Sequence, residues 1–223
     1  MKEKNTKKET ETYFKYHAVF VIPEFPFFHK LNLNPFVGIE ERLVHFPKQY
    51  HSSGLSFNTR LRDLAAVLML NNKDTDKIIT MSRAVRGYMD ESCASLMKKH
   101  IKNFSDHKIL VEENSYDLSS EISQVFNIAD KNNWHKVAIL VDSVQAIRAR
   151  EIIDNLDSEI NVAVVTMDEI LTDNSYTKHH SETFINIISK FHKSNYWKYW
   201  ANRERLVRIL PSNVLTKITN ISR

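Results

Sequence analysis

Five short runs of aliphatic and β-branched residues constrain the fold of this chain more than any other feature. Each run is apolar throughout instead of alternating with polar residues, which is typical of strands covered on both faces. The runs lie at residues 16–22, 77–81, 108–111, 136–141 and 161–165. We therefore expect a sheet that is buried between two layers.

The segments between these runs carry apolar residues at helical spacing. Helices are expected near residues 58–70, 88–103, 118–129 and 146–156, and Asp117 is a candidate N-cap for the third. Strands that alternate with helices form right-handed βαβ units. The pattern predicts an α/β, Rossmann-like fold: a mostly parallel sheet of about five strands, helices on both faces and extra C-terminal helices. Ligands of such sheets bind beyond the carboxyl ends of the strands.

We expect a single α/β domain over residues 16–223. Residues 1–15 mix lysine with glutamate and predict a disordered tail. Residues 23–57 form a long insertion rich in proline and phenylalanine, either a packed excursion or a lid or partner surface. Residues 181–223 predict a helical extension. There, Trp197 and Trp200 favour a C-terminal helix docked on the sheet over a surface for a protein partner, nucleic acid or membrane.

The chain has only three glycines and one cysteine, and both counts limit its chemistry. Neither GxGxxG nor GxxxxGK[ST] occurs, so we expect no standard dinucleotide or P-loop nucleotide site, and any cofactor is unknown. Cys93 cannot form a disulfide within the chain, and its place on an apolar helix face predicts an inert core residue. The ten histidines show neither HxxxH nor HExxH spacing, so no metal site is expected.

Charge and hydropathy bear on partners and location. The net charge of +4 is a slight excess, which does not favour a nucleic-acid partner. The first apolar stretch, residues 18–22, is too short to span a bilayer, and nothing resembles a secretory signal. A cytoplasmic location without a membrane span is expected.

Four segments between residues 77 and 153 follow one another in an order and spacing known from other proteins. They read KIITMSR, DESCASLMKKHI, ILVEENSYDLSSE and AILVDSVQAIRARE. In the order, the spacing and the apolar positions of these segments, the chain resembles the YdcF, SanA and ElyC family, which consists of α/β proteins of largely unassigned function. The resemblance covers about a third of the chain. Residues 60–70 also resemble the family's first helix, which carries an arginine near its start.

Some polar positions of the family pattern are kept and others are replaced. The kept positions are Glu91, Glu112, Ser115, Arg148 and Ala149. The replacements are Ser82 and Arg83 for two glycines, Leu118 and Asp142 for threonines, Glu121 for asparagine and Gln145 for histidine. Glutamine cannot act as a general acid or base near neutral pH. The resemblance therefore implies a site that is altered or catalytically degenerate.

The candidate site residues all follow strand ends. They are Arg83, Arg86, Glu112, Ser115, Asp142, Gln145 and Arg148, with Glu113 beside them. In a parallel sheet these ends share one edge, where arginines and carboxylates together could bind a charged small molecule. The competing interpretation is a structural ion-pair network that closes the loops, in which Asp142 is simply a helix N-cap.

Three functions remain open from the sequence. The first is a YdcF-like protein that binds a small anionic or nucleotide-like ligand at the carboxyl edge of its sheet, with weak or absent catalysis. The second is a non-catalytic interaction protein that uses residues 23–57 and the aromatic C-terminal segment. The third is an enzyme acting on a phosphorylated or cell-envelope metabolite, as the family resemblance implies.

Overall fold

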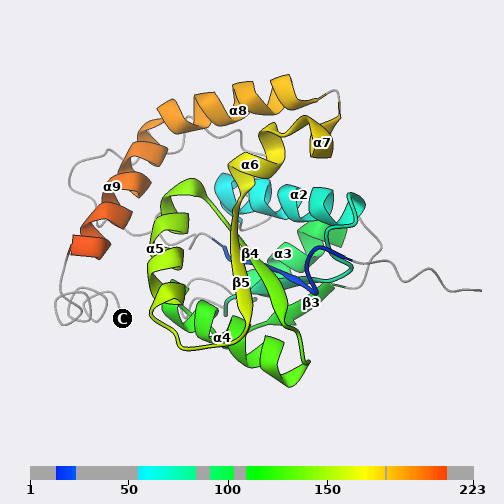
Figure 1. Cartoon of the computed structure of the whole chain (residues 1–223). Coiled ribbons are helices and arrows are strands. Elements are labelled where there is room, and N and C mark those ends of the chain that lie inside the picture. Colours follow the sequence, from blue (N-terminus) through cyan, green and yellow to red (C-terminus); the bar gives the residue numbers. More distant parts are fainter. Residues whose placement is uncertain (1–13, 24–54, 84–90, 103–108, 179, 210–223) are drawn as a thin grey trace, which may run out of the picture.

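Five parallel strands form the sheet at the centre of the molecule. A computed structural model describes residues 14–23, 55–83, 91–102, 109–178 and 180–209. The strands within these residues are β1 (Val19–Val21), β2 (Ile78–Met81), β3 (Ile109–Glu112), β4 (Lys136–Val141) and β5 (Asn161–Thr166). They lie in the order β3-β2-β1-β4-β5 (Figure 1). The predicted parallel α/β fold is confirmed, and each predicted strand overlaps an observed one.

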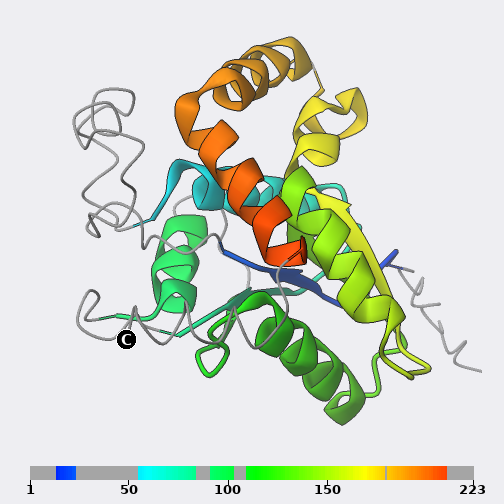
Figure 2. The ribbon, with the colours of Figure 1, turned by 90° about the vertical axis from the view of Figure 1, so that its left-hand side faces the viewer.

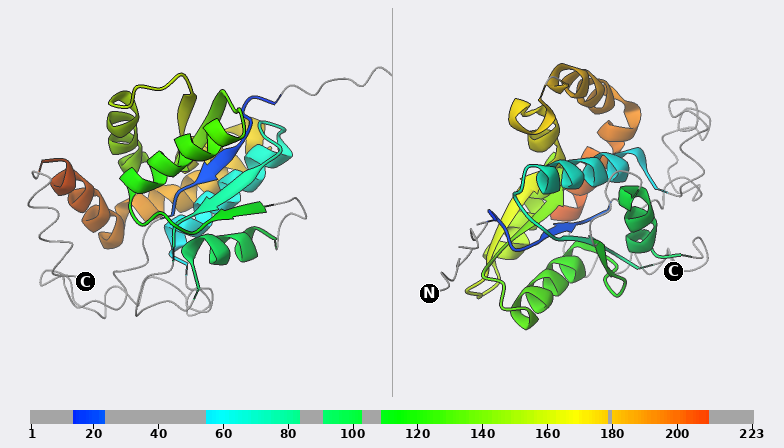
Figure 3. Two further views of the ribbon diagram at one scale, coloured as in Figure 1. Left: turned by 90° about the horizontal axis from the view of Figure 1, so that it is seen from below. Right: turned by 90° about the vertical axis from the view of Figure 1, so that its right-hand side faces the viewer.

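Helices cover both faces of the sheet (Figure 3). On one face lie α2 (Phe57–Asn71) and α3 (Cys93–Lys102), and on the other lie α4 (Leu118–Lys131) and α5 (Ser143–Asp154). After β5 come α6 (Met167–Thr172), α7 (Asn174–Thr177), α8 (Ser181–Lys193) and α9 (Asn195–Ile209). The expected helices between the strands and in the C-terminal extension are therefore present.

The alternation of side chains along β1 divides the core into two layers. Val19 and Val21 pack with α2 and α3, whereas Phe20 and Ile22 pack with α4 and α5. Successive side chains of a strand point to opposite faces, so a run that is apolar throughout can fill both layers. This explains why the central strands read as continuous apolar runs and not as alternating ones.

Carboxylates fix where two of the helices begin. Asp117 caps α4 by accepting a hydrogen bond from the backbone N–H of Ser120 at 2.8 Å, as the sequence predicts. Asp142 caps α5 in the same way, through the N–H groups of Val144 and Gln145. Both caps lie directly beyond the carboxyl ends of strands, so they also determine which side chains reach that edge of the sheet.

The C-terminal helix α9 docks through its tryptophans. Trp197 is 8% exposed and Trp200 is 2% exposed, so neither ring offers a partner surface in this conformation. The helix lies on the carboxyl side of the sheet, beside α5 and α8 (Figure 2). Trp197 and Trp200 belong to the same core cluster as Val19 and Val21, so the expected docking of a C-terminal helix is observed.

Several expectations fall on residues that the structure does not describe. Most of the expected disordered tail, residues 1–13, and most of the insertion, residues 24–54, lie outside the described residues, as does Arg86. Among the residues that are described, no helix has the length and apolar character needed to cross a membrane. Cys93 is 1% exposed, and burial raises the pKa of its thiol, in agreement with a core residue.

Candidate functional site at the carboxyl edge of the sheet

The strand order places a topological switch point at the carboxyl ends of β1 and β4. From β1 the sheet continues to β2 on one side and to β4 on the other. The next described helix after β1, α2, and the helix after β4, α5, cover opposite faces. Parallel sheets bind ligands at such a switch in strand order, outside the carboxyl ends. The expected location of the site is therefore well defined.

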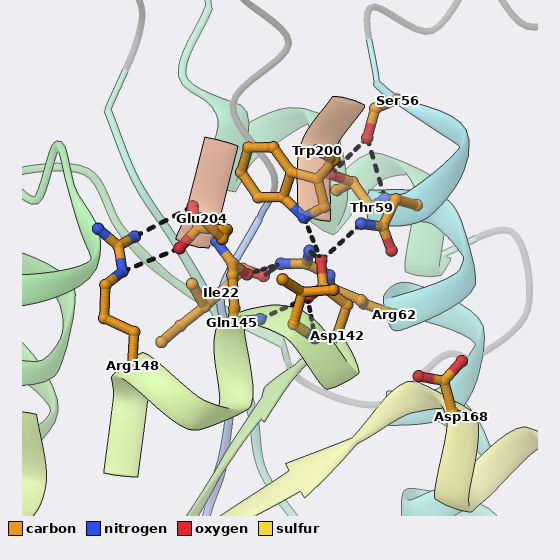
Figure 4. A network of polar contacts seen from close by, with 12 residues as sticks. Ile22, Ser56, Thr59, Arg62, Asp142, Gln145, Arg148, Asp168, Trp200 and Glu204 are labelled. Atoms are coloured by element: carbon orange, nitrogen blue, oxygen red, sulfur yellow. Dashed lines mark hydrogen bonds and ion pairs between the residues drawn. The ribbon is translucent and has the colours of Figure 1, made fainter. Parts of the chain in front are cut away.

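Asp142 is the centre of a buried network at this point (Figure 4). One carboxylate oxygen, Oδ1, accepts the two backbone hydrogen bonds that cap α5, at 2.9 and 2.7 Å. The other, Oδ2, accepts from Arg62 Nη2 at 2.6 Å, from Asn58 Nδ2 at 2.8 Å and from Trp200 Nε1 at 2.8 Å. Five donors fill the acceptor sites of one carboxylate, so Asp142 has none left for a ligand.

Arg62 ties the first strand to this network. It lies on α2 with its side chain fully buried, and it forms an ion pair with Asp142. Its Nη1 donates to the carbonyl of Ile22 and, at 2.8 Å, to Gln145 Oε1. Gln145 thus orients an arginine and holds the end of β1. The structural interpretation of the predicted Asp142 and Gln145 pair fits these contacts.

Arg148 is partly exposed beside this network, one turn further along α5. Its Nε lies 3.0 Å from Oε2 of Glu204, and its Nη2 lies 3.5 Å from Oε1. Glu204 comes from α9 and its side chain is 1% exposed, whereas that of Arg148 is 22% exposed. The arginine that the sequence proposes for anion contact is therefore already paired with a carboxylate of the chain itself (Figure 4).

The two predicted residues after β3 pair with each other. The Glu112 carboxylate accepts backbone hydrogen bonds from Asn114 at 2.7 Å and from Ser115 at 3.2 Å, and a short one from the Ser115 hydroxyl. Both side chains are buried. This local turn shapes the loop, and the hydroxyl of Ser115 is committed to the carboxylate beside it.

Ser82, which directly follows β2, combines an unusual backbone with an unpaired hydroxyl. Its φ is 92°, in the left-handed region that favours glycine, and its carbonyl accepts from the N–H of Ala94. The residue is completely buried, and within the described part of the chain Oγ has no hydrogen-bond partner. Strained backbone and unpaired buried polar atoms both concentrate at functional sites.

Glu121 also has an unpaired buried oxygen at this edge. It lies in the first turns of α4, is 1% exposed, and its Oε1 has no hydrogen-bond partner among the described residues. Burial and the nearby Asp117 raise the pKa of Glu121 to about 8, although Arg62 and Arg148 lower it. At neutral pH this carboxyl holds a proton, so it can donate a hydrogen bond and does not repel an anion.

The remaining predicted residues lie at the outside of the edge. Arg83 is exposed and stacks over the ring of Tyr116, with its guanidinium carbon 4.7 Å from the ring centroid. Glu113 is exposed and accepts from the hydroxyls of Ser92 and Ser95. These hydrogen bonds lower the pKa of Glu113. The structure thus brings the described candidates to one edge but divides them among separate small clusters.

Five residues that define this edge were not among the predicted site residues, although Glu121 was noted as replacing the family's asparagine and Trp200 as docking a C-terminal helix. They are Asn58, Arg62, Glu121, Trp200 and Glu204. Three of them are charged residues inside an apolar helical stripe. Arg62 is in phase with Ala66 and Met69, and Glu204 is in phase with Trp197 and Trp200. A charge on the buried face of a helix is the sequence signal that could have identified the three charged residues.

Comparisons give no relative from which a role could be transferred: no protein-family model, curated protein or solved structure matches the chain. Within the described residues, no group of three or more His, Cys, Asp or Glu side chains could hold a metal ion. The chemistry of the edge must therefore be argued from its own contacts.

Proposed function

We propose that this chain is a YdcF-like protein that binds a small anionic or nucleotide-like ligand at the carboxyl edge of its sheet. The ligand would lie near Ser82 and Glu121, with Arg148 at its charged end. The observation that carries the proposal is that the fully buried Ser82 Oγ and Glu121 Oε1 have no hydrogen-bond partner among the described residues. Native proteins pair nearly all such groups, so an unpaired one needs a physical explanation.

Two further features support a ligand at this place. Ser82 holds a left-handed conformation at the position where the YdcF, SanA and ElyC family has glycine, and such strain is commonly retained for function. Charge is also suitable for an anion, because Arg148 is cationic while the raised pKa of Glu121 keeps its carboxyl neutral at pH 7. The proposal is for binding, and it assigns no catalytic step.

Thermal denaturation with a panel of phosphate-bearing probes tests this function. Inorganic phosphate, AMP, ADP and glucose 6-phosphate are each added at millimolar concentration, and the shift in Tm is measured. A ligand present at 100 times its Kd stabilises the folded state by about 2.7 kcal/mol, so a bound probe gives a clear shift. We expect at least one nucleotide or sugar phosphate to raise Tm.

Variants locate the effect. Arg148→Ala and Glu121→Leu should each lose the ligand-induced shift, measured against the variant's own ligand-free Tm. Arg150→Ala, an exposed arginine on the same helix, removes the same charge and should keep the shift. If no probe shifts the wild type, or if both site variants respond as the wild type does, the proposed function is wrong.

A further inference from the structure

Glu204 holds Arg148 in the way that an anionic ligand would hold it. Its two carboxylate oxygens face Nε and Nη2 of the guanidinium, the edge that arginine presents to carboxylates and phosphates. The alignment is imperfect, because Nε and Oε2 are 3.0 Å apart without the geometry of a hydrogen bond. An oxyanion that is free to orient could form two aligned hydrogen bonds with the same edge.

Glu204 also stands on an element that is separate from the sheet. It is carried by α9, the last described helix, whose nearest partners are α5 and α8. The contacts of α9 include the hydrogen bond from Trp200 to Asp142, the packing of Trp197 on Phe191 of α8, and an exposed ion pair between Arg208 and Glu151. Exposed ion pairs contribute little to stability, so the rim of the site depends mainly on buried contacts of α9.

We infer that the carboxylate of Glu204 is an internal occupant of the anion position at Arg148, and that a bound oxyanion displaces it. The inference rests on the proposed function and adds the ligand's chemistry: a carboxylate or phosphate group with two oxygens for Nε and Nη2. The exchange replaces one anion by another on the same arginine, so Arg148 is not left as an unpaired charge. The released Glu204 carboxylate regains hydration as α9 shifts.

Competition of this kind lowers the apparent affinity of the ligand. Only molecules in which Glu204 has left Arg148 can bind, so the measured Kd is the intrinsic Kd divided by that fraction. Glu204→Gln keeps the shape of the side chain and removes the competing charge. We expect it to bind inorganic phosphate at least tenfold more tightly than the wild type does, measured by isothermal titration calorimetry at fixed ionic strength.

A matched control separates competition from general loosening of α9. Glu151→Gln breaks the exposed pair with Arg208, which joins the same two helices but does not involve Arg148. It should bind phosphate with the affinity of the wild type. If Glu151→Gln gains as much affinity as Glu204→Gln, or if neither gains any while the wild type binds, the inference is overturned and the proposed function stands. If neither the wild type nor Glu204→Gln binds any probe, both fail.

A spectroscopic measurement tests the same displacement without the Glu204 variant, in case that protein does not fold. The indole N–H of Trp200 donates to Asp142, and its NMR signal can be assigned with Trp200→Phe. Saturating phosphate should shift this signal in the wild type. The indole signal of Trp134 should stay in place, because Trp134 lies between α4 and the start of β4, at the opposite edge of the sheet. A bound probe that leaves the Trp200 signal unchanged would contradict movement of α9.

Discussion

The two halves of the carboxyl edge differ in how far their buried polar groups are paired. At β1 and β4, Arg62, Asp142, Gln145 and Trp200 form one hydrogen-bonded network, in which only Arg62 Nε and Asn58 Oδ1 have no partner among the described residues. At β2 and α4, Ser82 and Glu121 are just as buried, but neither the Ser82 hydroxyl nor Glu121 Oε1 has a partner there. Both halves lie beyond the carboxyl ends of strands in one sheet, so position alone does not separate structure from function.

The difference shows how the edge is divided between stability and binding. A carboxylate with five donors is fully used inside the protein, and changing it harms the fold. An unpaired buried oxygen costs free energy in the absence of a ligand, so changing it should relieve the fold. Substitutions in the two halves should therefore have opposite effects on the free energy of unfolding.

The largest expected effect is in the paired half. Asp142→Asn places an amide NH₂ or a neutral oxygen against Arg62 and leaves that guanidinium as an uncompensated buried charge. Breaking one partner of a buried ion pair costs about 3–5 kcal/mol. The loss should appear as a lower midpoint in urea denaturation at pH 7 with little change in slope.

An exposed pair supplies the comparison for this loss. Asp76→Asn removes a carboxylate that pairs with Lys77 at the surface, and such pairs are worth roughly 0–1 kcal/mol. If Asp142→Asn were no worse than Asp76→Asn, the network around Asp142 would not be the structural centre of this half.

The second effect has the opposite sign and depends on pH. Between pH 4.5 and 8 the folded Glu121 keeps its proton while the unfolded one releases it, because its pKa is raised to about 8. Wild-type stability therefore falls as pH rises through this window. Glu121→Gln removes that fall, so it should match the wild type near pH 4.5 and exceed it above pH 8. Each pKa unit corresponds to about 1.4 kcal/mol, so the gain is on the order of several kcal/mol at most.

Urea titrations of both proteins from pH 3 to 9 measure this difference. Asp63, whose pKa is raised to about 6 by burial, titrates in the same window, but it is present in both proteins and cancels. Glu113→Gln is the control of opposite sign. Hydrogen bonds lower the pKa of Glu113, so its contribution is present above its ordinary pKa and lost as pH falls. Parallel profiles for Glu121→Gln and the wild type would show that Glu121 is ionised in the fold.

The fold could be predicted from the sequence because its signals are local and repeated. Each strand is a short apolar run, each helix has a periodic face, and Asp117 stands where a helix must begin. Hydrophobic burial is proportional to area and does not depend on exact partners. The periodic pattern was therefore enough to predict a parallel sheet between two layers of helices, but not its strand order.

The site was predicted less completely because its contacts join residues far apart in the chain. The sequence indicates that Asp142 and Arg148 lie at the same edge of the sheet. It does not indicate that Asp142 pairs with Arg62, 80 residues before it, or that Arg148 pairs with Glu204, 56 residues after it. A hydrogen bond depends on distance and angle between particular atoms. The sequence marks these residues only as charges within apolar helical stripes, and this pattern does not predict which residues they pair with.

The smallest expected effect concerns Ser82 and separates strain from the unpaired hydroxyl. Ser82→Gly removes both the Cβ that opposes a φ of 92° and the hydroxyl that has no partner, so it should raise stability by about 1 kcal/mol. Lys73→Gly is the matched control, because Lys73 also has a positive φ, 63°, but is exposed and buries no polar atom. Urea denaturation of both variants measures the two contributions. If Ser82→Gly raises stability more than Lys73→Gly does, the excess is due to the buried hydroxyl. Equal increases in stability would mean that the unpaired hydroxyl costs no free energy, and Ser82 would then give no support for a ligand at this half of the edge.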